Sequence, residues 1–263
     1  MNGLLLRLAG PLQSWGERSA FTPQRDTAPF PTRSALIGMF AAAQGTARED
    51  TRALEQYTDL EFTVRVDRPG LPLVDYHTVG GGQPKDQTAA TSGGSHKGAA
   101  VVTRRHYLAD AVFVVAITGS DTIVDRIATA LHQPHWAPYL GRRSCIPDEP
   151  LLLRTRTPDP VAELLTRTPL SPTTRHDETR QRSAQVDETV PVAFLWERHP
   201  GDLPTDAVSV AINDIPSSFA QHHRAHTKRH LHRTIRHLPA SLLPDRDNPL
   251  HQRLIDYAKE EQG

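Results

Sequence analysis

Positive charge is concentrated in one stretch of a chain whose net charge is zero. Residues 221–240 contain no Asp or Glu, although Lys+Arg and Asp+Glu balance at 30 each over the 263 residues. Within this stretch we predict that Arg224, Lys228 and Arg229 contact a polyanion. A basic face on a neutral protein is typical of a nucleic-acid site. The alternative is a solvated strand with scattered positive charge.

A second cationic element is the compact sequence Gly141-Arg142-Arg143. Two guanidinium groups on one turn could bind phosphates in a bidentate manner. Cys145 follows two residues later without an activating motif, so we interpret it as a small packed residue rather than a nucleophile.

His222, His223 and His226 resemble a metal-ligand cluster. No Cys or suitably spaced carboxylate completes such a site, and the neighbouring arginines would repel a cation. We expect neither a metal nor a cofactor, and interpret these histidines as part of a partly protonated basic face.

Cationic and aromatic residues also lie near the N-terminus. Thr32 can cap the helix that begins after it, close to Ser34, and a capped helix start with Arg25 and Arg33 beside it could bind phosphate. The alternative for Arg33 is an ion pair with a nearby acid such as Asp26.

Gln13 and Trp15 follow the first predicted strand. Trp15 could stack on an unpaired base and Gln13 could lie beside it. The alternative for Trp15 is a partly buried core aromatic.

The elements that must position these residues follow from apolar periodicity. Strands are predicted over residues 4–9, 60–67 and 109–119, with helices over residues 33–44 and 121–132. A Gly-rich insertion at about residues 77–106 carries Lys97, Arg104, Arg105 and His106. This order predicts an α+β protein with a ferredoxin-like βαββαβ domain over residues 1–147, similar in arrangement to RNA-recognition modules. Residues 148–240 are predicted to be irregular and β-rich, and residues 241–263 to form a terminal helix or tail.

A single cysteine rules out an intramolecular disulfide and favours a reducing compartment. No apolar run approaches the length of a membrane span. We therefore expect a cytoplasmic protein without a membrane partner.

Three blocks carry a family resemblance: "LLLRLAGPLQSWG" from Leu4, "FPTRSALIGMFAAAQG" from Phe30 and "YLGRRSCIP" from Tyr139. Together, in this order, they resemble the CasD-type subunits of type I-E CRISPR Cascade complexes. The resemblance implies a non-catalytic subunit that binds the 5′ handle of CRISPR RNA, with the Gly-rich insertion as a protruding thumb. It also implies contacts with the backbone subunit and with the large PAM-reading subunit, and an indirect role in target DNA recognition.

Two other functions remain open from the residues. A metal-independent endoribonuclease would need a general base and a cation, which His96-Lys97 or His106-Tyr107 could supply. Relatives in another Cascade subtype process CRISPR RNA, but in type I-E systems a separate subunit cuts it, so the resemblance argues against activity here. A scaffold that contacts only protein is the third possibility, and the basic stretches argue against it.

Overall fold

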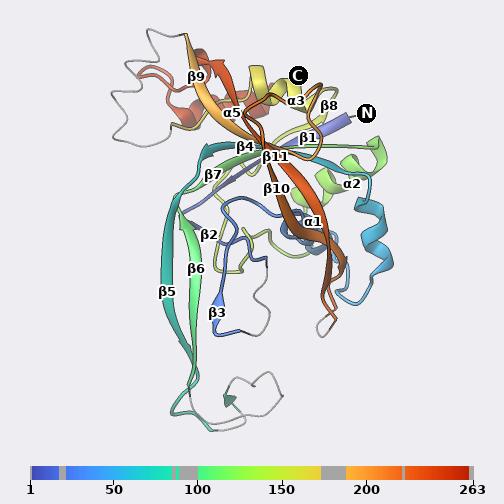
Figure 1. Cartoon of the computed structure of the whole chain (residues 1–263), viewed down its shortest axis with the longest axis vertical. Helices are drawn as coiled ribbons and strands as arrows, with labels where there is room; N and C mark the ends of the chain where they lie inside the picture. The colour runs from blue at the N-terminus through green and yellow to red at the C-terminus, as the bar shows by residue number, and fades with distance from the viewer. Residues whose placement is uncertain are drawn as a thin grey trace.

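The computed structural model describes residues 2–17, 22–84, 87–88, 100–172, 188–220 and 223–260. Its centre is a seven-stranded antiparallel sheet in the order β10-β11-β9-β4-β7-β1-β8 (Figure 1). The strands are β1 (Asn2–Ala9), β4 (Glu61–Arg68), β7 (Val112–Gly119), β8 (Leu152–Thr157), β9 (Thr189–Trp196), β10 (Val208–Ser218) and β11 (Ala225–Pro239).

The central strands are buried on both faces, which explains their continuous apolar sequences. Side chains alternate along β1, so that Leu4 and Leu6 enter one hydrophobic core while Leu5 enters the other. Helices α1 (Arg33–Ala43) and α2 (Asp121–His132) cover the first face, and α3 (Pro160–Thr166) and α5 (Leu250–Lys259) cover the second. Short 3₁₀ helices lie at η1 (Arg52–Tyr57) and η3 (Ala240–Leu242). The predicted mixed α and β composition is therefore confirmed.

The C-terminal strands do not form a sheet of their own. β9 pairs with β4, from Thr63 opposite Trp196 to Val66 opposite Ala193, and β11 and β10 continue the sheet outward. The predicted parts, residues 1–147 and 148–240, thus share one sheet. The tail predicted over residues 241–263 contains helix α5.

A smaller four-stranded sheet carries an arm that projects from the body (Figure 1). It contains β2 (Leu12–Gln13), β3 (Gln24–Arg25), β5 (Leu71–Val79) and β6 (Val101–Ala109). β5 and β6 pair from Leu71 opposite Ala109 to Val79 opposite Val101. The predicted irregular insertion at 77–106 is thus corrected: its base is a regular hairpin that begins at residue 71. Lys97 and His96 lie outside the described residues, as does His222.

A fully buried ion pair fixes the segment that follows α3. The Arg65 guanidinium donates to Asp67 Oδ1 at 2.7 Å and to the carbonyl oxygens of Leu164, Thr168 and Pro169. Asp67 also accepts a hydrogen bond from the Ser171 backbone N–H at 2.9 Å. Both side chains are 0% exposed, so each charge depends on the other for compensation.

We expect Asp67→Asn to lower the free energy of unfolding by about 3–5 kcal/mol, because it leaves the Arg65 charge buried without a counter-ion. Denaturant titration of the purified protein measures this. Asp110→Asn is the matched control, since Asp110 pairs with Arg68 at the surface and Asn tolerates its positive φ of 56°. Surface pairs contribute about 0–1 kcal/mol, so similar losses in both variants would contradict the expectation.

Candidate nucleic-acid interface

Four arginines from separated segments come together beside the base of the arm. β3 pairs with β6 in parallel, and in this register Arg25 lies opposite Arg105. Burial lowers the pKa of Arg25, and the positive charges of Arg105, Arg142 and Arg224 lower it further. We call Arg25, Arg105, Arg142 and Arg224 the cationic face. Such mutual repulsion is relieved when a polyanion binds.

Arg142 is held in place by its surroundings. Its guanidinium carbon lies 4.5 Å from the centre of the Tyr107 ring. Its Nη2 donates to the backbone carbonyls of Arg25 at 3.2 Å and Asp26 at 3.4 Å. These contacts tie the 141–143 turn to β3 and β6, so Arg142 reaches the cationic face with its orientation largely fixed. The adjacent Arg143 is exposed to solvent.

Gly141 has a structural reason to be glycine. Its φ is +84°, and a Cβ atom there would lie 1.7 Å from the Ser14 carbonyl oxygen. The turn therefore packs directly on the backbone that follows β1. Gly141 positions Arg142, and Cys145 is buried below the turn, where burial raises the pKa of its thiol.

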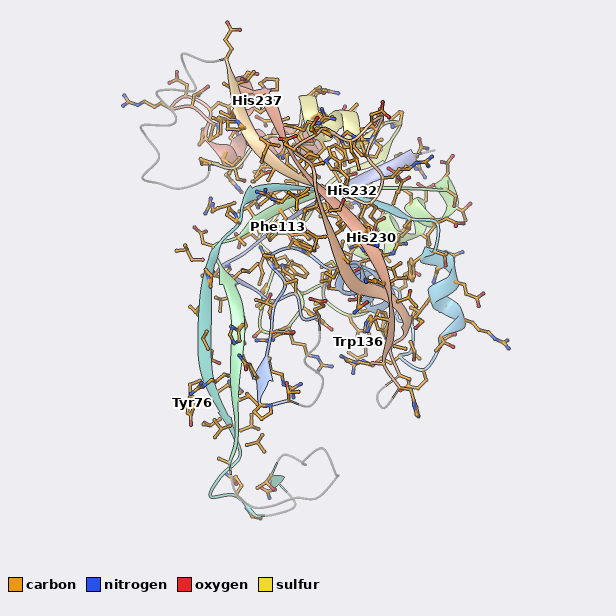
Figure 2. All side chains as sticks on the ribbon, viewed as in Figure 1. Tyr76, Phe113, Trp136, His230, His232 and His237 are labelled. Carbon is orange, nitrogen blue, oxygen red and sulfur yellow. The ribbon has the colours of Figure 1, made fainter. Side chains whose placement is uncertain are left out.

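Further polar side chains lie along β6. Arg104 is exposed and is the cross-strand partner of Tyr76, whose ring is 66% exposed on the arm (Figure 2). His106 is partly exposed, and its Nε2 lies 3.3 Å from Gln24 Nε2 on β3. An exposed aromatic ring beside a guanidinium is a surface on which an unpaired base can stack.

Gln13 and Trp15 lie in the core, which corrects the prediction that they face RNA. Both are 0% exposed. Gln13 Nε2 donates to the carbonyls of Leu8 at 3.0 Å and Ala111 at 2.8 Å, and its Oε1 accepts from Trp15 Nε1 at 3.2 Å. The Gln13 amide thus satisfies two buried backbone carbonyls and the Trp15 indole N–H. The alternative that Trp15 is a core aromatic is confirmed.

Arg33 and Arg229 also lie inside the protein, in a cluster with two carboxylates. We call Arg33, Glu197, Asp214 and Arg229 the buried quartet. Arg33 Nη1 lies 2.9 Å from both oxygens of Glu197, Arg229 donates to both Asp214 oxygens, and Arg229 also pairs with Glu197. The side chains are 11% exposed or less. Neither arginine is placed to meet a phosphate, which corrects both predictions.

The N-terminus of α1 is bound by a carboxylate of the same buried quartet. The Arg33 backbone N–H donates to Asp214 Oδ2 at 2.7 Å, and Thr32, although it is the N-cap residue, makes no capping bond with its side chain. Thr32 Oγ1 lies 3.4 Å from Ser34 Oγ instead. The predicted phosphate site at this helix start is therefore taken by a protein carboxylate. An acid between the apolar residues Ile212 and Ile215 of the strand sequence "AINDIP" is the signal that could have identified Asp214.

The predicted basic stretch divides between surface and interior. Arg224 and Lys228 are exposed, whereas Arg229 is buried in the quartet. Burial and the neighbouring Arg224 lower the pKa of His226, so this imidazole is neutral near pH 7 rather than part of the positive charge. Among the described residues, the positive charges that act on Arg25 at this surface are those of Arg105, Arg142 and Arg224.

Among the described residues, no helix has the length and apolar character that crossing a membrane requires.

Comparison with known proteins identifies relatives of the whole chain. The curated protein "CRISPR system Cascade subunit CasD" from Escherichia coli (strain K12) is 38% identical over 180 residues, which cover 64% of this chain and 77% of that protein. A chain of a solved "CRISPR RNA-guided surveillance complex" is 45% identical, with a TM-score of 0.81 and coverage of 98% of this chain and 99% of the other. A "Crystal structure of Cas protein" is 28% identical with a TM-score of 0.50, over 92% and 98%.

The family model described as "CRISPR-associated protein (Cas_Cas5)" matches residues 3–232. This match spans the first hydrophobic core, the arm and the cationic face, ends within β11 before α5, and agrees with the resemblance seen in the three sequence blocks. The chain belongs to the Cas5 family of CRISPR-associated proteins.

Proposed function

We propose that this protein is the CasD-type subunit of a CRISPR RNA-guided surveillance complex and that it binds the 5′ handle of the CRISPR RNA through the cationic face. The observation that carries the proposal is the convergence of Arg25, Arg105, Arg142 and Arg224 from four segments of the chain. Charges that repel each other in the free protein gain most when a phosphate backbone supplies the opposite charge.

Arg104 and Tyr76 lie on the other face of β6 and offer a further contact surface on the arm. Base stacking on Tyr76 would add sequence-tolerant affinity to the phosphate contacts, as is usual for single-stranded RNA. The handle would thus lie across β3 and the base of the arm, with Arg142 and Arg143 at one side and Arg224 and Lys228 at the other.

The 45% identity to a chain of a surveillance complex, over nearly the full length of both chains, supports assembly into a similar complex. In this assembly the subunit would contact the backbone subunit and the large PAM-reading subunit, and would reach target DNA through the complex. We further infer that β1–α1–β4–β7–α2–β8 is a ferredoxin-like unit, because the antiparallel order β4-β7-β1-β8 fits that arrangement.

We infer a non-catalytic role for this subunit. Of the two histidine pairs considered, His96-Lys97 lies outside the described residues. His106 lies on β6 within hydrogen-bond distance of Gln24, and its neighbour Tyr107 packs below Arg142. Tyr107 is 6% exposed, so this pair offers one accessible side chain rather than an acid and a base that face the same phosphate.

The first test measures binding of a 5′-labelled repeat-derived RNA across a salt series. Replacing both Arg105 and Arg224 by Gln removes two phosphate contacts. We expect about 15-fold weaker binding at 0.15 M salt and a salt slope that is smaller by about 1.4, since each contact releases about 0.7 counterions from single-stranded RNA.

Arg246→Gln is the control for this test, because Arg246 is exposed in the loop before α5, away from the cationic face. It removes one positive charge and should leave affinity and slope unchanged. A loss of about fourfold and a slope smaller by about 0.7 in Arg246→Gln would mean that only net charge matters, and the proposed face would be abandoned.

The second test follows the integrity of the same RNA. After incubation with the purified protein in chelator, we expect the labelled RNA to remain full length over the period in which the binding equilibrium is measured. Shortened RNA from the parent protein and intact RNA from an identically purified His106→Ala variant would replace the binding role with an endoribonuclease.

A further inference from the structure

We propose that Asp214 is a positioning residue for RNA binding: through the buried quartet it holds the β10–β11 hairpin at the angle that brings Arg224 into the cationic face. This inference rests on the proposed function. It assigns a role in recognition to a side chain that cannot itself contact RNA, because Asp214 is only 1% exposed.

Asp214 lies at the first of two bulges in β10, and the second lies between Pro216 and Ser218. Asn213 pairs with Lys228 and Ile215 pairs with Thr227, so Asp214 has no partner residue on β11. A bulge bends a strand and redirects one side chain. Here the redirected carboxylate points at the start of α1 and binds both the Arg33 N–H and the Arg229 guanidinium.

The part of the hairpin beyond this bulge carries Arg224. The bulge precedes Pro216–Ser218, and Arg224 directly precedes β11. Figure 1 shows this hairpin running down past α1 on the right, with β3 at the lower left, and the positive charge of Arg224 acts on Arg25 of β3. The hairpin also meets α1 through an apolar contact: the Phe219 ring lies 3.8 Å from the point where a Cβ on Gly38 would stand. An apolar contact is not directional, whereas the paired hydrogen bonds of Asp214 fix an angle.

The ion pairs of the buried quartet fix the angle between the β10–β11 hairpin and α1. It contains two arginines and two carboxylates, and all of them are nearly excluded from solvent. If Asp214 loses its charge, two buried guanidinium groups share the Glu197 carboxylate, and the excess charge favours movement of the hairpin that lets water reach Arg229. Such movement carries Arg224 away from Arg25.

The test is a double-mutant cycle of Asp214→Asn and Arg224→Gln, read by RNA affinity and salt slope. Arg224→Gln alone should weaken binding about fourfold at 0.15 M salt and lower the slope by about 0.7, as expected for one lost phosphate contact. Asp214→Asn alone should give the same two changes. The double variant should bind like Asp214→Asn alone, because a displaced Arg224 no longer contributes.

A stability-matched variant separates positioning from general destabilisation. Leu254→Ala creates a cavity in the hydrophobic core on the other face of the sheet, where Leu254 is 2% exposed. It should lower the melting temperature while the salt slope stays unchanged. If Asp214→Asn does not fold, Arg229→Lys replaces it in the cycle, since Lys keeps the charge but loses the two-pronged geometry.

The outcomes distinguish this inference from the function on which it rests. A full Arg224→Gln effect in the Asp214→Asn background would overturn the positioning role and leave the RNA-binding face intact. No effect of Arg224→Gln in the parent protein would remove Arg224 from the proposed face. A slope loss in Leu254→Ala equal to that of Asp214→Asn would also overturn the positioning role.

Discussion

The arrangement of this protein depends on the burial of four charged side chains between the first helix and the last hairpin. Taking Arg33, Glu197, Asp214 and Arg229 out of water is costly, and the cost is recovered only when every partner is in place. The start of α1, the end of β9 and the bulge of β10 must therefore meet at one point. That requirement explains why the C-terminal strands extend the N-terminal sheet, since β9 must pair with β4 for Glu197 to reach Arg33 and the Phe62 N–H.

The smaller sheet solves a different problem, which is to keep like charges close together on a surface. Arg25 and Arg105 lie opposite each other in the parallel pairing of β3 with β6. Arg142 is held against both strands, because its guanidinium packs on the Tyr107 ring and donates to the carbonyls of Arg25 and Asp26. Gly141 allows the turn to approach Ser14 closely enough for this contact. The protein thus uses two clusters of arginines in opposite ways. The quartet is neutralised internally and supports the fold, whereas the cationic face gathers four guanidinium groups where an external polyanion can bind.

Much of the fold could be predicted from local sequence. The apolar run in β7 and the spacing of Ile123, Ile127 and Leu131 in α2 define buried surfaces with little dependence on neighbours. The terminal helix predicted within residues 241–263 is present as α5 for the same reason. The base of the arm was predicted as irregular because its Gly-rich continuation hides the regular pairing of β5 with β6, which depends on a partner strand about 30 residues away.

The sequence by itself determined the strands and helices that carry a local apolar pattern, the supply of positive charge and, through three short blocks, the family. Only the tertiary structure decided which arginines are available to a ligand. Arg33 and Arg224 are equally basic in sequence, but Arg33 meets Glu197 at a separation of 164 residues and is buried, while Arg224 stays exposed. Local periodicity predicts whether a side chain faces a core. It does not predict which charged side chain from a distant segment will be its partner there. The partner of a buried charge is set by contacts between distant segments, and those exist only once the chain has folded.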